Sequence, residues 1–281
     1  MTTAAPTTTS LHPAPPRSRG TAVADAMTML RRELRHQLRY PSVTLMLVLM
    51  PVVFLLMFVF LLGGTLGAGI SGAPTGGRAE YLAYVTPGIL LVAVASVAQG
   101  TSMSVAMDMT EGIVARFRTM SIGRGAVLTG HVVGAVIQTV ICVTVVLAVA
   151  IAIGFRPSAT PVEWLAALGV LLGIAVAITW VTVAIGTLSR TIEGASNLPM
   201  PLLLLPFLGS GFVPTESMPA GVRWVADHQP FTPFTETVRG LLMGTAIGSS
   251  AVATTVWCVV LGVGGYLIAR SAYDRHSLRT A

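Results

Sequence analysis

The residues that could do chemistry in this 281-residue chain are few, and their types exclude several reaction classes. All 17 basic residues are arginines, so no lysine can hold nucleotide phosphates or form a Schiff base. Cys142 and Cys258 lie inside apolar runs, where small packed side chains are expected rather than metal ligands or a disulfide. His131 is expected to be interfacial, with a proton relay as the alternative. No zinc-ligand spacing and no carboxylate pair occurs within the apolar runs.

The largest group of charged side chains between apolar runs is an island at residues 108–124. If this island is helical, Ile113, Phe117 and Met120 form one apolar stripe. In a membrane protein such an island is a cytoplasmic loop, which a soluble partner can reach, although an ordinary basic loop has the same composition. The side chains that would face water or a partner are Glu111, Arg116, Arg118 and Arg124.

Composition indicates an integral membrane protein, because 53% of residues are hydrophobic and only 10% are charged. Six charge-free runs each reach the roughly 20 residues that a helix needs to cross the hydrocarbon core. We therefore predict an all-α fold with a six-span domain at residues 42–270. The expected spans are about 43–62, 82–106, 126–154, 165–189, 194–212 and 248–269.

The two ends of the chain differ from the spans. Residues 1–20 are rich in Thr, Pro and Ala and are expected to be a disordered cytoplasmic tail. Residues 271–281 are expected to be a second cytoplasmic tail. In residues 21–41, leucines and arginines recur at helical spacing on different faces. This pattern predicts an amphipathic interfacial helix, with a solvated helix on a soluble domain as the alternative.

The arginines predict the orientation. Six spans put both ends on one side, which then holds 13 arginines, against four on the other: Arg78, Arg156, Arg223 and Arg239. By the positive-inside rule the richer face is cytoplasmic, so we expect a multi-pass protein of the cell membrane with both termini inside. The arginines are spread along a membrane face and gather in no groove with aromatics, so no nucleic-acid partner is expected.

Two predicted spans and one loop are irregular. The fifth span carries Pro199, Pro201 and Pro206 and should be bent. Residues 212–248 are divided by prolines and are expected to form short re-entrant or interfacial helices that dip apolar side chains into the outer leaflet. Polar side chains within the spans would pack between helices or line a wetted path. The candidates for such a path are Gln99, Ser102 and Asn197.

Residues 210–244, SGFVPTESMPAGVRWVADHQPFTPFTETVRGLLMG, resemble the segment before the last span in permeases of type 2 ATP-binding cassette exporters, specifically the daunorubicin-resistance branch. Glu111-Gly112 and Arg116-Phe117-Arg118 resemble that family's loop after the second span. The chain departs from the family at Ser121, where a proline is usual, and at Thr110, where a charge is common. The residues that match in the first segment include Pro214, Met218, Pro219, Gln229, Pro230, Arg239 and Gly240.

The resemblance implies a transport subunit that is not itself an enzyme and that exports amphipathic or hydrophobic small molecules. It implies a second permease chain, identical or homologous, and two separate ATPase subunits that bind ATP and Mg, with no cofactor or metal in this chain. Glu111, Gly112, Arg116, Phe117 and Arg118 would form a coupling helix on which the ATPase docks. A polysaccharide or glycolipid permease of the same family remains an alternative, as does a membrane scaffold without transport activity.

Overall fold

The computed structural model describes residues 41–71, 77–110, 124–189 and 191–279, together with Met27 and Arg31. Over these residues the regular secondary structure is helical, with no strand. The elements in chain order are α2 (Pro41–Met57), η1 (Phe58–Leu62), α3 (Gly63–Ser71), α4 (Arg78–Thr110), α6 (Arg124–Ala152), α7 (Pro161–Leu188), α8 (Ile192–Asn197), α9 (Met200–Leu208), η2 (Thr215–Ser217), α10 (Ala220–His228), α11 (Phe231–Met243) and α12 (Ser250–Arg279).

Within the described part of the chain, five helices are long and apolar enough to cross a membrane, which confirms an all-helical protein of several spans. They are Thr44–Gly67, Arg78–Thr110, Val127–Ala152, Pro161–Leu188 and Ser250–Tyr273.

The span expected at residues 194–212 is not among these five, because this part of the chain forms two short helices, α8 and α9. Together they make a shorter apolar stretch, Ile192–Leu208. Helix α8 ends where Leu198 donates its backbone N–H to Gly194, and Pro199 follows. Because Pro199 and Pro201 have no N–H to continue the helical hydrogen bonds, the break falls between the two helices. The prolines therefore interrupt the helical hydrogen bonds, while the backbone of Leu198 and Pro199 stays in the right-handed helical region.

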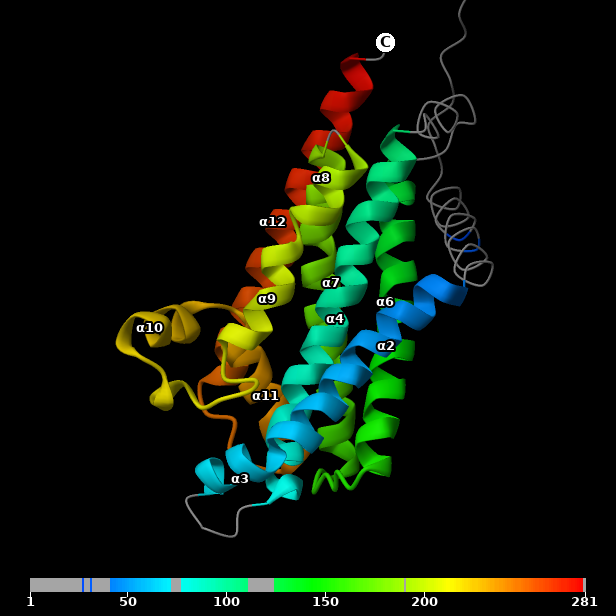
Figure 1. The fold of residues 1–281 in the computed structure, drawn as a ribbon. Helices are drawn as coiled ribbons and strands as arrows, with labels where there is room; N and C mark the ends of the chain where they lie inside the picture. The colour runs from blue at the N-terminus through cyan, green and yellow to red at the C-terminus, as the bar shows by residue number, and fades with distance from the viewer. Residues whose placement is uncertain are drawn as a thin grey trace, which may run out of the picture.

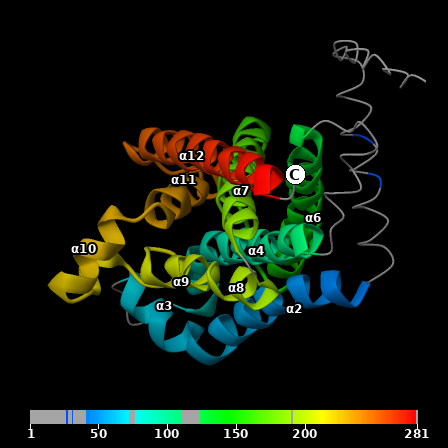
Figure 2. The same ribbon diagram turned by 90° about the horizontal axis from the view of Figure 1, so that it is seen from above.

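Helix α4 lies at the centre of the bundle, as the two perpendicular views show (Figures 1 and 2). It packs against α2, α6, α7, α8, α9 and α11. Of its most apolar stretch 89% is buried, against 17% for Thr44–Gly67 and 11% for Ser250–Tyr273. The central helix is thus enclosed by protein, and the outermost helices present apolar side chains such as Leu45 and Val256 to their surroundings.

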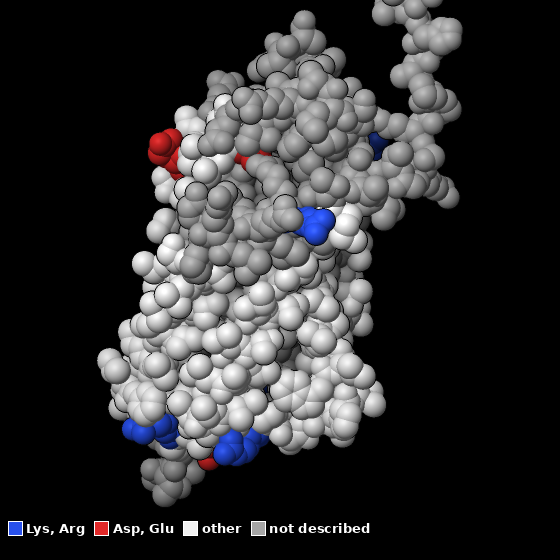
Figure 3. Space-filling view, turned by 90° about the vertical axis from the view of Figure 1, so that its right-hand side faces the viewer, with Lys and Arg blue, Asp and Glu red and all other residues white. Residues whose placement is uncertain are grey.

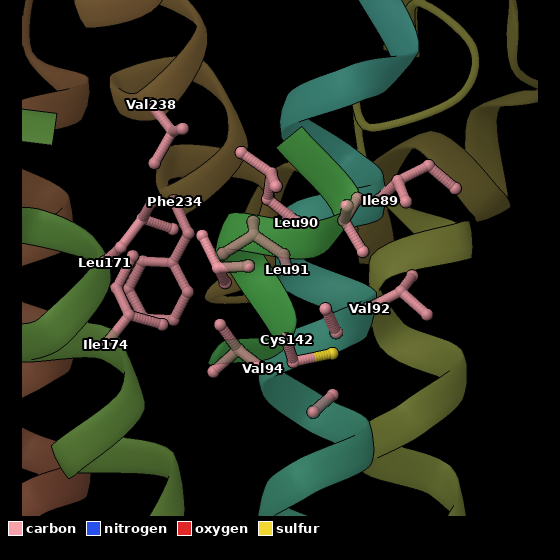
Figure 4. Close-up of a cluster of buried hydrophobic side chains, with 14 of the residues drawn as sticks. Ile89, Leu90, Leu91, Val92, Val94, Cys142, Leu171, Ile174, Phe234 and Val238 are labelled. Carbon is pink, nitrogen blue, oxygen red and sulfur yellow. The ribbon is translucent and has the colours of Figure 1, made fainter. Parts of the chain in front are cut away.

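The core is a continuous cluster between α4, α6, α7 and α11 (Figure 4). Leu91 of α4, Ile174 of α7 and Phe234 of α11 are all completely buried within it. Two helix crossings are so close that only glycine fits. A Cβ at Gly186 of α7 would lie 2.5 Å from the Ser102 carbonyl oxygen of α4, and one at Gly265 of α12 would lie 2.6 Å from the Trp180 backbone of α7. These contacts hold the long helices together backbone to backbone.

Charged side chains lie toward the two ends of the molecule on the face in Figure 3, with a broad uncharged band between them. At one end, helix α7 begins with reciprocal capping: Thr160 accepts a hydrogen bond from the Glu163 backbone N–H, and the Glu163 carboxylate accepts one from the Thr160 N–H. Pro161 fits the first turn because its missing N–H would have no helical partner there. The uncharged band is the part suited to hydrocarbon.

Candidate functional site

The first candidate site is the re-entrant segment, residues 209–244, which follows α9. Its first four residues, 209–212, have no regular structure and are nevertheless buried. A Cβ at Gly88 of α4 would lie 2.7 Å from the Gly211 carbonyl oxygen, so the segment touches the central helix backbone to backbone. Irregular backbone at membrane depth must be buried in protein with its polar groups bonded. Side chains supply these bonds here.

Arg239 of α11 is the main donor to this buried backbone. Its Nη2 donates to the Ser210 carbonyl oxygen at 2.6 Å and to the Tyr84 carbonyl oxygen at 3.1 Å. Its guanidinium carbon also lies 3.8 Å from the centroid of the Tyr84 ring, a cation–π contact. Burial lowers the pKa of Arg239, an effect that Tyr84 and Glu236 oppose. Since arginine stays charged even so, Arg239 is a half-buried cation that joins α11, α4 and the segment's first residues.

Two further side chains complete the same network. Gln229 Nε2 donates to the Leu205 carbonyl oxygen at 3.0 Å, at the end of α9 where carbonyls lack helical partners. Tyr81 Oη donates to the Phe212 carbonyl oxygen at 3.4 Å. Thus Arg239 within α11 and Gln229 in the turn between α10 and α11 both donate to the backbone of this region.

The other predicted residues of this segment shape its turns. Pro214, Pro219 and Pro230 each stand immediately before a helix, namely η2, α10 and α11, and Met218 ends η2. A Cβ at Gly240 would lie 2.8 Å from Ile247 Cγ1, so glycine lets α11 pack against the chain that leads to α12.

One expectation about the segment is wrong. Phe231, Phe234 and Leu242 were expected to dip into the outer leaflet, yet each is at most 1% exposed and belongs to the protein core. Helix α11 packs against α4, α7 and α12 rather than lipid. By contrast, α10 is largely exposed, with Trp224 64% accessible. Only the part around α10 is suited to the membrane interface.

The second candidate site lies at the other end of α4. Asp108 and His131, on α4 and α6, are 7% and 5% exposed, and His131 Nε2 lies 3.1 Å from Asp108 Oδ2. His131 is therefore a buried residue with an acidic partner. The predicted docking residues Glu111, Gly112, Arg116, Phe117 and Arg118 lie outside the described residues, between these two helices.

The three residues considered for a translocation path do not form one site. Gln99 Nε2 donates to the Ser196 carbonyl oxygen at 3.1 Å and so ties α4 to α8. Ser102 is completely buried at the crossing of α4 and α7. Asn197 is exposed at the end of α8. Gln99 and Ser102 serve helix packing, and Asn197 alone faces outward.

These features define a class of protein: a multi-pass helical membrane protein with a partly buried helical segment before its last long helix and a charged stretch of sequence between α4 and α6. The chain belongs to the ABC-2 type transporter family, whose family model matches residues 25–243. Members of this family are the permease, or transport, subunits of ATP-binding cassette systems, which associate with an ATPase and often with a second permease. The resemblance in the sequence is thereby confirmed.

Two relatives show where in the family the chain falls. It is 30% identical to the daunorubicin resistance ABC transporter permease protein DrrB1 of Streptomyces coeruleorubidus over 230 residues, covering 82% of this chain and 78% of the relative. It is 28% identical to the probable doxorubicin resistance ABC transporter permease protein DrrC of Mycobacterium tuberculosis over 187 residues, covering 62% of this chain and 65% of the relative.

Proposed function

We propose that this chain is the membrane subunit of an exporter that moves amphipathic or hydrophobic drugs out of the cell, driven by ATP hydrolysis on separate subunits. The observation that carries the proposal is the family match over residues 25–243, with relatives named for daunorubicin and doxorubicin resistance. The absence of lysine is consistent with a chain that leaves ATP binding, with its phosphate-holding lysine, to a partner.

The test is efflux of daunorubicin from cells that express the chain, a cassette ATPase encoded beside it, or both. We expect efflux only when both are present, and no ATP hydrolysis by the purified chain alone. Efflux by the chain alone that a protonophore abolishes would instead establish a secondary carrier.

We further propose that Ile192–Leu208 and the buried residues 209–212 make a sixth, interrupted crossing. If the 17 residues of Ile192–Leu208 rose as in a continuous helix, they would extend about 26 Å, close to the roughly 30 Å of the hydrocarbon core. Six crossings place both termini on one face, which the arginines make cytoplasmic. With Cys142 and Cys258 replaced, Thr75→Cys should react with an impermeant thiol reagent from outside, and Thr119→Cys should not. The opposite labelling would invert this topology.

The loop at residues 108–124 is proposed as the surface on which the ATPase docks, with two ATPase subunits serving a pair of permease chains. If docking removes its charges from water, reversing one costs several kcal/mol, against about 0 to 1 kcal/mol in a solvated loop. Glu111→Arg and Arg118→Glu should therefore weaken copurification of the ATPase while leaving membrane insertion intact. The control reversals, Arg78→Glu and Arg156→Glu, should leave copurification unchanged. Normal association in the two loop variants would contradict the assignment.

A further inference from the structure

The buried pair Asp108–His131 joins the two helices that flank the charged loop in the sequence, and the family assignment does not explain this contact. Asp108 lies in the last turn of α4, three residues before the undescribed stretch 111–123, and His131 lies in the second turn of α6 after it. Their side chains meet at 3.1 Å although 23 residues separate them in the sequence. The contact therefore joins α4 to α6 at the two ends of the loop.

The pair lies at the end of the bundle where a second hydrophobic cluster packs. This cluster is distinct from the main core, and four helices contribute to it. A carboxylate with so little exposure is tolerated only when it is paired or well hydrogen-bonded, and a hydrogen bond assisted by charge is stronger than a neutral one. The residues of this cluster are Val105, Leu128, Val132, Val183, Ala184, Ala269 and Tyr273.

The position of Asp108 is also unfavourable for α4 taken alone. The carboxyl end of a helix carries a partial negative charge, so an acidic side chain there is repelled unless a neighbour compensates. His131 supplies that compensation from a different helix. A residue that breaks a local rule and depends on a distant partner is typical of a functional position rather than of simple packing.

We propose that Asp108 and His131 form a brace that holds the ends of α4 and α6 together at the base of the loop, so that a displacement of the loop moves both helices as one unit. This inference rests on the proposed function, because the displacement would come from the docked ATPase. Both are positioning residues: they touch neither substrate nor nucleotide, and they make ATP hydrolysis productive. Without the brace, the ends of α4 and α6 can move independently of each other.

The first test is geometric and does not depend on transport. In a chain without Cys142 and Cys258, nitroxide labels at Thr110 and Val133, both exposed, report the spacing of the two helix ends by pulsed electron resonance. Asp108→Asn and His131→Ala should broaden the distance distribution, and the exchange Asp108→His with His131→Asp should narrow it again. An unchanged distribution in both single variants would overturn the proposal.

The second test measures coupling. In vesicles holding the chain and its cassette ATPase, Asp108→Asn and His131→Ala should lower the ratio of daunorubicin exported to ATP hydrolysed by about tenfold, and the exchanged pair should restore it. The control is Gln138→Ala, which removes another buried bond of α6, to Thr44 of α2, far from the loop. If Asp108 and His131 served stability alone, their variants would lower export and ATP hydrolysis together and leave the ratio unchanged. That result would refute the brace. If the unmodified complex exported nothing, the proposed function would fail, while the label distances would still decide whether the brace exists.

Discussion

Replacing Arg239 with methionine tests whether the re-entrant segment is held by side-chain bonds to its backbone. The change keeps a long unbranched side chain but removes the donor to the Ser210 carbonyl oxygen and the stack on Tyr84. A buried carbonyl left without a donor costs about 1 to 3 kcal/mol, and losing the cation–π contact adds about 0.5 to 2 kcal/mol. The Tyr84 carbonyl lies within helix α4 and can keep its helical hydrogen bond, so losing the Arg239 donor there adds less to the destabilisation. We expect a destabilisation of about 1.5 to 5 kcal/mol.

Thermal unfolding of the purified chain in lipid nanodiscs, followed with a dye that reacts with newly exposed Cys142 and Cys258, measures this loss. A destabilisation in that range should lower Tm by roughly 3 °C or more. Arg223→Met is the matched control, because Arg223 lies in the same segment but is exposed and 3.6 Å from an exposed Asp227. Such a pair contributes about 0 to 1 kcal/mol. If both variants melted together, Arg239 would not hold the segment and the reasoning would fail.

Three other substitutions test separate contacts by the same assay. Gly186→Ala should lower stability by about 1 to 3 kcal/mol because the new Cβ meets the Ser102 backbone. Its control is Gly169→Ala on the same helix, where the new Cβ has open space, and this change should be neutral or stabilising by up to about 1 kcal/mol. Gly88→Ala should be at least as harmful as Gly186→Ala and should also increase proteolysis near residue 211, since its Cβ displaces the Gly211 backbone. Thr160→Ala should cost about 0.5 to 2 kcal/mol through the lost cap of α7, and Thr160→Ser should restore most of it.

The long helices could be predicted because charge-free runs of about 20 residues or more are typical of membrane-spanning helices. The place of α11 could not, and the reason is physical. Phe231 and Phe234 are apolar, and apolar side chains suit lipid and a protein core equally well, so composition does not tell which one surrounds them. The three prolines of the expected fifth span predicted a bend, but how far the helical hydrogen bonds are interrupted depends on neighbours that replace the lost bonds.

The contacts of Arg239 and of Asp108 with His131 could not be predicted from the sequence either. Arg239 was expected in an outer loop, and its partners are backbone carbonyls, which every residue has and no side-chain pattern reveals. Asp108 ends one apolar run and His131 begins another, so each looks solitary in the sequence. Their contact depends on how α4 crosses α6, which follows from packing over the whole length of both helices.

These two contacts sit near opposite ends of the same helix, and this arrangement bears on how movement at one end could reach the other. Helix α4 carries both Tyr84, which contacts Arg239, and Asp108, and the two residues lie about 36 Å apart along the helix axis. Because α4 is enclosed by neighbours and touches α7 and residue 211 backbone to backbone, it has little room to bend independently of them. A shift of the Asp108 end of α4 must therefore move the Tyr84 end or strain the Arg239 contact. The re-entrant segment and the loop would then be coupled through α4 itself, and Arg239→Met should weaken export without changing how the ATPase docks.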